Sequence, residues 1–322
     1  MSENSSDNDL FRYSNSLSPF NEKSREESNK SKIIKIIFII LLGQLLTILY
    51  TFNNYLLKEI KAPFNFPILF NSFYFLCFGF FWLIFLHRFS KVNIYNIFII
   101  ILHSQYIFFY NTPYNDNDQN LSSIFYLICI IFTFIFNFFF FSKIKNSILH
   151  LIGIFIVLFG IFYIYFFTDS SKIDYLKEIK EHITTVIFII ISSICFSLSI
   201  LLIQKYLKKS DILEFYPLYG IIEGIILLFQ SFIFKEPINF IQKKEIEFRI
   251  LGLIIIFIIS SSFLIGLFPY YIQSTSAGIF NINLCSFIFW NSLFFDDKNN
   301  YHFYIGNLII ILGIIFFSQK LN

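Results

Sequence analysis

Long apolar runs separated by short polar breaks repeat along most of the chain. A membrane-spanning helix needs about 20 predominantly apolar residues, because each residue rises about 1.5 Å through a hydrocarbon core of about 30 Å. The pattern therefore predicts ten transmembrane helices, at residues 33–57, 67–87, 94–111, 121–141, 146–167, 183–204, 212–234, 249–272, 275–295 and 301–318. The third run is the most polar of them, since His103, Ser104 and Gln105 interrupt it.

The composition strengthens this prediction. Of the 322 residues, 56% are hydrophobic, 22% are aromatic and only 14% are charged, whereas soluble proteins average about 25% charged residues. Residues 1–32 are instead rich in Ser, Asn and charged residues, and such a composition predicts a disordered tail. We therefore expect a multi-pass protein of the lipid bilayer. Its net charge of +3 lies in loops and gives no reason to expect a nucleic-acid partner.

Basic residues indicate the orientation, because they concentrate in short cytoplasmic loops. If the tail is cytoplasmic, the short loops on the same side contain Arg88, Lys91, Lys143, Lys145, Lys205, Lys208 and Lys209. We therefore expect both termini in the cytoplasm, with the chain in the plasma membrane or an endomembrane.

A glycine pattern recurs in the fifth and tenth runs. Gly153 and Gly160 are seven residues apart, as are Gly306 and Gly313, and the offset between the pairs is 153 residues. The same offset relates Ser122-Ser123 to Thr275-Ser276, at the starts of the fourth and ninth runs. Since five is odd, two five-helix halves would have opposite orientations. The pattern predicts two inverted repeats, residues 33–167 and 183–318, an arrangement that transporters use.

Small residues mark the places where we expect helices to approach closely. The break between the eighth and ninth runs contains Pro269, a run of hydroxyl residues and Gly278. Within it, Ser276 and Ala277 are expected to pack against another helix. The same role is expected of the glycines, which would join helices of one chain or pair two chains in a homodimer; they are Gly153, Gly160, Gly220, Gly224, Gly306 and Gly313.

Five polar side chains inside the runs are candidates for binding a substrate. Glu223 is the one acid well inside a run, and a charge at that depth costs about 2.5–3.5 kcal/mol, so it should face the bundle interior. It would hold a substrate or a proton, or else bond a neighbouring helix as a neutral acid. The amides would bind a polar substrate or bond another helix at about 0.6 kcal/mol per pair; they are Gln44, Gln105, Asn281 and Asn283.

Motifs of enzymes and metal sites are missing from the sequence. There is no P-loop, GxSxG, HExxH or GxGxxG motif, and the five histidines are dispersed. The cysteines Cys77, Cys129, Cys195 and Cys285 lie in apolar runs without metal-binding spacing, which is typical of small packing residues. We expect no catalytic residue, no metal and no cofactor.

Several segments, taken together in their order and spacing, resemble subfamily F of solute carrier family 35, in the drug/metabolite transporter superfamily. Leu42-Gly43-Gln44 is similar to the subfamily's opening, and Asn71-Ser72-Phe73 after Pro67 resembles its entry to the second span. The segment Lys205-Tyr206-Leu207-Lys208-Lys209, with Glu214-Phe215 and Gly220 after it, is also similar. The strongest similarity is Pro269 followed by Ser274-Thr275-Ser276-Ala277 and Asn281.

The resemblance implies a ten-helix secondary transporter that carries a small polar organic solute, of the nucleotide-sugar or nucleobase-like class, by alternating access. Acidic residues of the subfamily are replaced here by His103-Ser104-Gln105 and by Gln204-Lys205, and its Asp-containing fourth span reads Leu127-Ile128-Cys129. If those acids contact substrate in relatives, this chain binds a different substrate or binds it differently. The alternatives are an integral-membrane transferase and a membrane scaffold that transports nothing.

Overall fold

A computed structural model describes residues 19–61, 66–86, 93–111, 119–141, 147–167, 183–207, 211–237, 248–274, 280–281, 283–286, 290 and 301–318. The chain forms two compact units, Met1–Leu42 and Gly43–Asn322. The first contains the N-terminal part of helix α1. All contacts and cavities below lie within the second unit.

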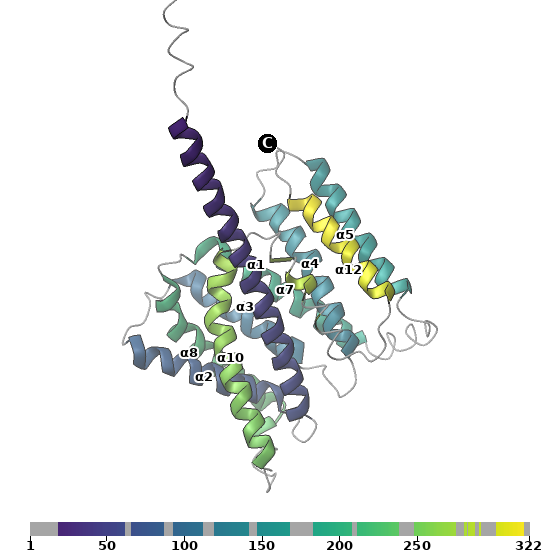
Figure 1. The fold of residues 1–322 in the computed structure, drawn as a ribbon. Helices are drawn as coiled ribbons and strands as arrows, with labels where there is room; N and C mark the ends of the chain where they lie inside the picture. The colour runs from purple at the N-terminus through teal and green to yellow at the C-terminus, as the bar shows by residue number, and fades with distance from the viewer. Residues whose placement is uncertain are drawn as a thin grey trace, which may run out of the picture. The chain divides into compact units, whose positions relative to one another are not determined.

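Regular structure in these described residues is helical (Figure 1). The long helices are α1 (Pro19–Lys61), α2 (Pro67–Leu86), α3 (Ile94–Asn111), α4 (Gln119–Phe141), α5 (Ser147–Phe167), α7 (Ile183–Tyr206), α8 (Ile212–Ile233), α10 (Phe248–Ser274) and α12 (Tyr301–Ser318). Residues 280–281, 283–286 and 290 are helical as well, and we call them the ninth segment. The all-α class expected from the apolar runs is therefore confirmed.

Five described helical stretches are long and apolar enough to cross a membrane, which agrees with an integral membrane protein. They are Ile37–Leu56, Pro67–Leu86, Ile183–Tyr206, Ile212–Ile233 and Leu251–Ser274. Shorter apolar stretches occur at Phe125–Asn137, Ile152–Tyr163 and Tyr304–Phe316.

Apolar side chains cover the outer faces of these helices, and polar ones turn inward. On α10, Ile259 and Phe263 are 54% and 64% exposed, whereas Ser261 is only 3% exposed. A soluble protein rarely exposes so much contiguous apolar surface. Hydrocarbon around the bundle accounts for this inside-out distribution.

The structure differs from one predicted segment and describes another only in part. Helix α1 begins at Pro19, inside the tail 1–32 that the composition predicts to be disordered. Its Glu, Lys and Arg residues favour helix as well as solvation, which is how a polar tail can continue a membrane helix. Of the ninth run, 275–295, only the ninth segment is described; residues 275–279, which include Ser276 and Ala277, lie outside the described residues.

Helices α2 and α8 meet backbone to backbone. A Cβ atom added at Gly220 would lie 2.5 Å from both Cα and N of Gly79, and one added at Gly224 would lie 2.9 Å from the backbone nitrogen of Leu76. The contacts run in opposite order along the two helices, so α2 and α8 are antiparallel. The absence of side chains at Gly79 and Gly220 is what permits this approach.

Helices α5 and α12 pack in the same way, and Figure 1 shows them side by side. A Cβ atom at Gly160 would lie 3.0 Å from the carbonyl oxygen of Gly306, and one at Gly313 would lie 2.8 Å from that of Gly153. The four glycines of the repeated pattern therefore contact each other within one chain.

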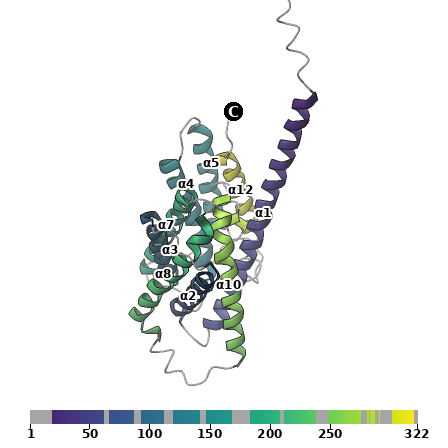
Figure 2. The same cartoon turned by 90° about the vertical axis from the view of Figure 1, so that its left-hand side faces the viewer.

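Helix α3 packs against both α7 and α8 (Figure 2). The start of α2 is held by the segment after α8, because the Leu69 N–H donates to the Glu236 carboxylate at 2.7 Å. An anion there satisfies a helix N-terminus that has no intrahelical acceptor. On the other side of α8, the Tyr216 hydroxyl donates to the Gly266 carbonyl of α10, one turn before Pro269. These contacts join five helices, α2, α3, α7, α8 and α10, around one interior.

Two alanine substitutions test the glycine packing. Gly220→Ala should lower stability by about 1–3 kcal/mol, because its Cβ meets only backbone atoms of α2. Gly252→Ala in α10 should instead raise stability by about 0.5–1 kcal/mol, because no atom of the described residues lies within 4 Å of its Cβ position and alanine restricts the unfolded chain. Thermal unfolding in detergent measures both. Equal shifts for the two variants would contradict the close α2–α8 contact.

Candidate functional site

A cavity of about 90 Å³ lies among α1, α2, α3, α7, α8 and α10. We call it the central cavity. Its polar lining consists chiefly of tyrosine and asparagine side chains, namely Tyr50, Tyr74, Tyr106, Tyr110, Tyr219, Asn53, Asn54, Asn71 and Asn111, together with His103 and Ser261. Phenylalanine and aliphatic side chains complete the wall. Polar groups gathered around an internal space in an apolar bundle are typical of a binding site.

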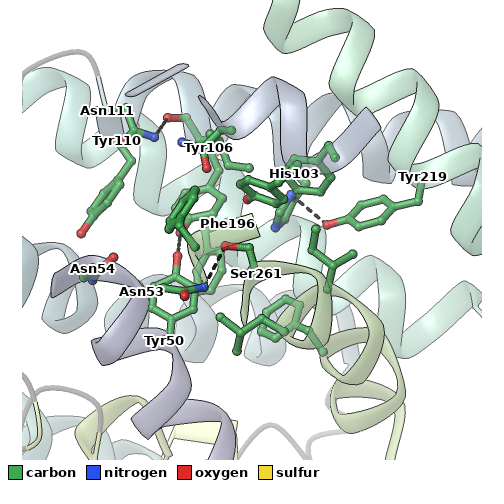
Figure 3. A pocket seen from close by; sticks show the side chains of 18 residues that line it. Tyr50, Asn53, Asn54, His103, Tyr106, Tyr110, Asn111, Phe196, Tyr219 and Ser261 are labelled. Atoms are coloured by element: carbon green, nitrogen blue, oxygen red, sulfur yellow. Dashed lines mark hydrogen bonds between the residues drawn. The ribbon is translucent and has the colours of Figure 1, made fainter. Parts of the chain in front are cut away.

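Hydrogen bonds hold the cavity walls together across helices (Figure 3). The Tyr50 hydroxyl of α1 is bonded to the Tyr106 hydroxyl of α3. The Asn53 amide donates to Ser261 of α10 at 2.9 Å, and its oxygen accepts from Ser260. Helix α1 is thereby tied to α3 and α10 by side chains that face the cavity.

His103 lies at one end of the cavity, and its shortest hydrogen bond is to a residue that does not line the cavity. Its Nδ1 lies 2.6 Å from Oε1 of Glu223 and 2.9 Å from the Tyr219 hydroxyl. Tyr219 and Glu223 are one helical turn apart on α8, so both face α3. Glu223 is fully buried and is not among the residues that line the cavity. Glu223 therefore does not line the cavity itself; it is linked to the cavity by its neighbours His103 and Tyr219, which do.

The short contact requires a proton between the two groups. An imidazole nitrogen and a carboxylate oxygen 2.6 Å apart can share one hydrogen bond only if one of them carries the hydrogen. With the proton on Nδ1, Nε2 of a neutral ring is an acceptor, as carboxylate-bonded histidines commonly are. The other carboxylate oxygen of Glu223 has no hydrogen-bond partner among the described residues. The pair thus presents His103 to the cavity in a defined orientation.

A second cavity of about 50 Å³ shares Tyr50, Phe196, Leu264 and Phe268 with the first. Asn283 lines it, and this brings two of the predicted amides together. The Gln44 amide donates to Asn283 at 2.9 Å and to Ser286 at 2.8 Å.

Gly43 makes room for this amide cluster. A Cβ atom there would overlap the Asn283 amide and approach the Tyr271 hydroxyl, to which Asn283 itself donates. A side chain at position 43 would require the Asn283 amide and the Tyr271 hydroxyl to move. Gln44 and Asn283 bond to each other across the bundle, as the interhelical alternative expects.

The remaining predicted residues lie elsewhere. Asn281 is fully buried, and neither atom of its amide has a partner in the described part of the chain; it lines neither cavity. Gln105 is half-buried on α3 and also lines neither cavity. Gly220 and Gly224 lie against α2, and the other four predicted glycines lie between α5 and α12.

Most residues of the central cavity are not distinguished by the sequence. Tyr and Asn are abundant throughout this chain, so Tyr50, Asn53 and Asn111 did not stand out from their neighbours. One usable signal was present: His103 interrupts an apolar run, as Glu223 does, and two ionisable residues in spans commonly pair. Within the described residues, no group of three His, Cys, Asp or Glu side chains is placed to hold a metal ion.

No protein-family model matches the chain, and no curated protein matches its sequence. Its class therefore rests on the fold and the cavity alone. In its described residues the chain is helical, with several helices long and apolar enough to cross a membrane and a cavity lined in part by polar side chains.

A double-mutant cycle tests the buried pair. His103→Ala leaves the Glu223 carboxyl buried without its partner and should cost about 3–5 kcal/mol, whereas Glu223→Gln preserves a hydrogen-bonding amide and should cost about 1 kcal/mol. His103→Ala combined with Glu223→Ala should cost less than the two alanine variants summed. Thermal unfolding in detergent gives these values. Strict additivity would mean that the two side chains do not interact.

Proposed function

We propose that this chain is a secondary transporter that carries a small polar organic solute by alternating access. The observation that carries the proposal is the central cavity, a space between six helices of an apolar bundle whose lining includes many hydrogen-bonding side chains. A structural bundle gains nothing from such a space, because unfilled volume costs packing energy. The lost packing energy is explained if a solute occupies the cavity.

The pairing of helices supports the two inverted five-helix halves of the proposal. Let α1, α2, α3, α4 and α5 correspond in order to α7, α8, α10, the ninth segment and α12. If each helix in a contacting pair is then replaced by its counterpart, the new pair is also in contact. The two most extensive pairs, α2 with α8 and α5 with α12, map onto themselves. The pair α3–α8 maps onto α10–α2, and both occur.

Two further helix pairs follow the same exchange. The pair α3–α7 maps onto α10–α1, which Asn53 and Ser261 join. The pair α4–α7 maps onto the ninth segment and α1, which Gln44 and Asn283 join. A two-fold relation between halves predicts such reciprocal contacts.

Individual contacts between α5 and α12 follow the same correspondence between the two halves. The Gly160 Cβ position approaches Gly306 and Ile310, and the Gly313 position approaches Gly153 and Val157. Adding 153 residues converts Gly153, Val157 and Gly160 into the other three. The sequence offset and the packing therefore support one and the same symmetry.

This arrangement supports the proposal of alternating access. The central cavity is bounded by α1, α2 and α3 of one half and by α7, α8 and α10 of the other. Rocking one half against the other would open the cavity to each side in turn. The proposal includes membership of the drug/metabolite transporter superfamily, near subfamily F of solute carrier family 35, on the motifs quoted above.

Filling the cavity tests the function. Leu264 lines both cavities, whereas its neighbour Phe263 is 64% exposed on the outer face of α10. In proteoliposomes screened with nucleotides, sugars and nucleobases, Leu264→Trp should abolish flux of the transported solute, since the larger side chain occupies the cavity. Phe263→Trp should leave the flux unchanged. Equal flux in both variants, or no flux of any solute by the unmodified chain, would contradict the proposal.

A further inference from the structure

The two cavities follow one another along the helices. On α1, the second cavity is lined between Gly43 and Tyr50, and the central cavity between Tyr50 and Asn54. On α10 the order is reversed, because Ser261 lines only the central cavity and Tyr271 only the second. This stretch of α1 rises about 16 Å at about 1.5 Å per residue, which is about half the thickness of a hydrocarbon core. The cavities therefore lie in series along the helix axes.

Four side chains line both cavities, and we call them the shared wall. They are Tyr50, Phe196, Leu264 and Phe268. Phe196 and Phe268 are stacked, with ring centroids 6.3 Å apart. Tyr50 is the polar member, and its hydroxyl is already bonded to that of Tyr106. A polar solute that leaves the central cavity here meets apolar side chains, and it gives up its hydrogen bonds without replacement.

Polar groups around the second cavity are bonded to one another. The Asn283 amide accepts from Gln44 at 2.9 Å and donates to the Tyr271 hydroxyl, and Thr47 donates to the Gln44 carbonyl at 2.7 Å. The surface that this cavity presents is accordingly apolar. An apolar cavity stays dry even at about 150 Å³, so a space of about 50 Å³ with this surface excludes water.

The central cavity has a different surface. It presents polar as well as apolar atoms, and about 90 Å³ accommodates several water molecules, because one needs about 10–15 Å³. Water that enters the central cavity therefore stops at the shared wall. Dry apolar constrictions gate channels in this way, since water and polar solutes do not enter until the constriction widens.

We propose that the solute path runs through both cavities and that the second cavity, together with the shared wall, is a hydrophobic gate that is closed in this structure. The proposal rests on the transport function proposed above and adds the position of its barrier. Tyr50 belongs to the first half and the rest of the shared wall to the second, so rocking of the halves widens the gate. The same movement parts Gln44 of α1 from Asn283 of the ninth segment, and the freed amides then face the path.

Thiol labelling tests the gate with a probe that is independent of the solute. The target is Ser261→Cys in the central cavity, in a full-length chain whose four cysteines are replaced by alanine. The probe is the impermeant reagent 2-(trimethylammonium)ethyl methanethiosulfonate, added to either side of reconstituted vesicles. From one side the reagent must pass the second cavity, and from the other it enters the central cavity directly.

Two substitutions at one position should have opposite effects. Leu46 lines the second cavity and is 5% exposed, whereas its neighbour Leu45 is 49% exposed on the outer face of α1. Leu46→Trp fills the gate and should slow labelling from the gated side at least about tenfold. Leu46→Asn, of similar size but polar, admits water and should speed it about tenfold. Labelling from the other side should stay within about twofold.

Leu45→Trp and Leu45→Asn are the matched controls and should leave both rates unchanged. If the Leu46 variants do not fold, the same pair of substitutions at Leu284 makes the comparison, since Leu284 also lines only the second cavity. Equal effects on the two sides, or effects of the same sign for Trp and Asn, would overturn the gate. The predicted labelling pattern without flux of any nucleotide, sugar or nucleobase would overturn the transport function and leave the gate in place.

Discussion

Hydrocarbon offers no hydrogen-bond partner, so each polar side chain of a membrane bundle must find one inside the protein. The contact between His103 and Glu223 at 2.6 Å is the clearest consequence in this chain. A lone carboxylate would cost several kcal/mol at this depth, and the histidine on a neighbouring helix compensates for it. This pairing sets α3 and α8 face to face and orients His103 toward the central cavity.

Close helix approach makes the interior possible. Gly79 and Gly220 bring α2 and α8 together, and Gly43 makes room for the amides of Gln44 and Asn283. Tyr50 and Asn53 then connect α1 to α3 and α10 from within the cavity. The residues that hold the bundle together are thus the same ones that line its polar space. Movement of one half would have to exchange these hydrogen bonds.

Some of this was predictable from the sequence. Apolar run length indicates membrane helices regardless of their partners, and glycine spacing marks surfaces where helices meet, because both signals are local. Glu223 was noticeable for the same reason. Its partner His103 is 120 residues away, and only the fold brings the two together. Asn54 and Asn111 resemble many other asparagines in this chain, and only the fold shows that both line the central cavity.

Thiol accessibility tests most directly whether the central cavity communicates with both sides of the membrane. Ser261 lines the cavity and is 3% exposed, and Ser261→Cys changes little in shape. In a chain whose cysteines Cys77, Cys129, Cys195 and Cys285 have been replaced by alanine, Ser261→Cys should react with a membrane-impermeant thiol reagent added to either side. Labelling from one side only, or from neither, would contradict alternating access.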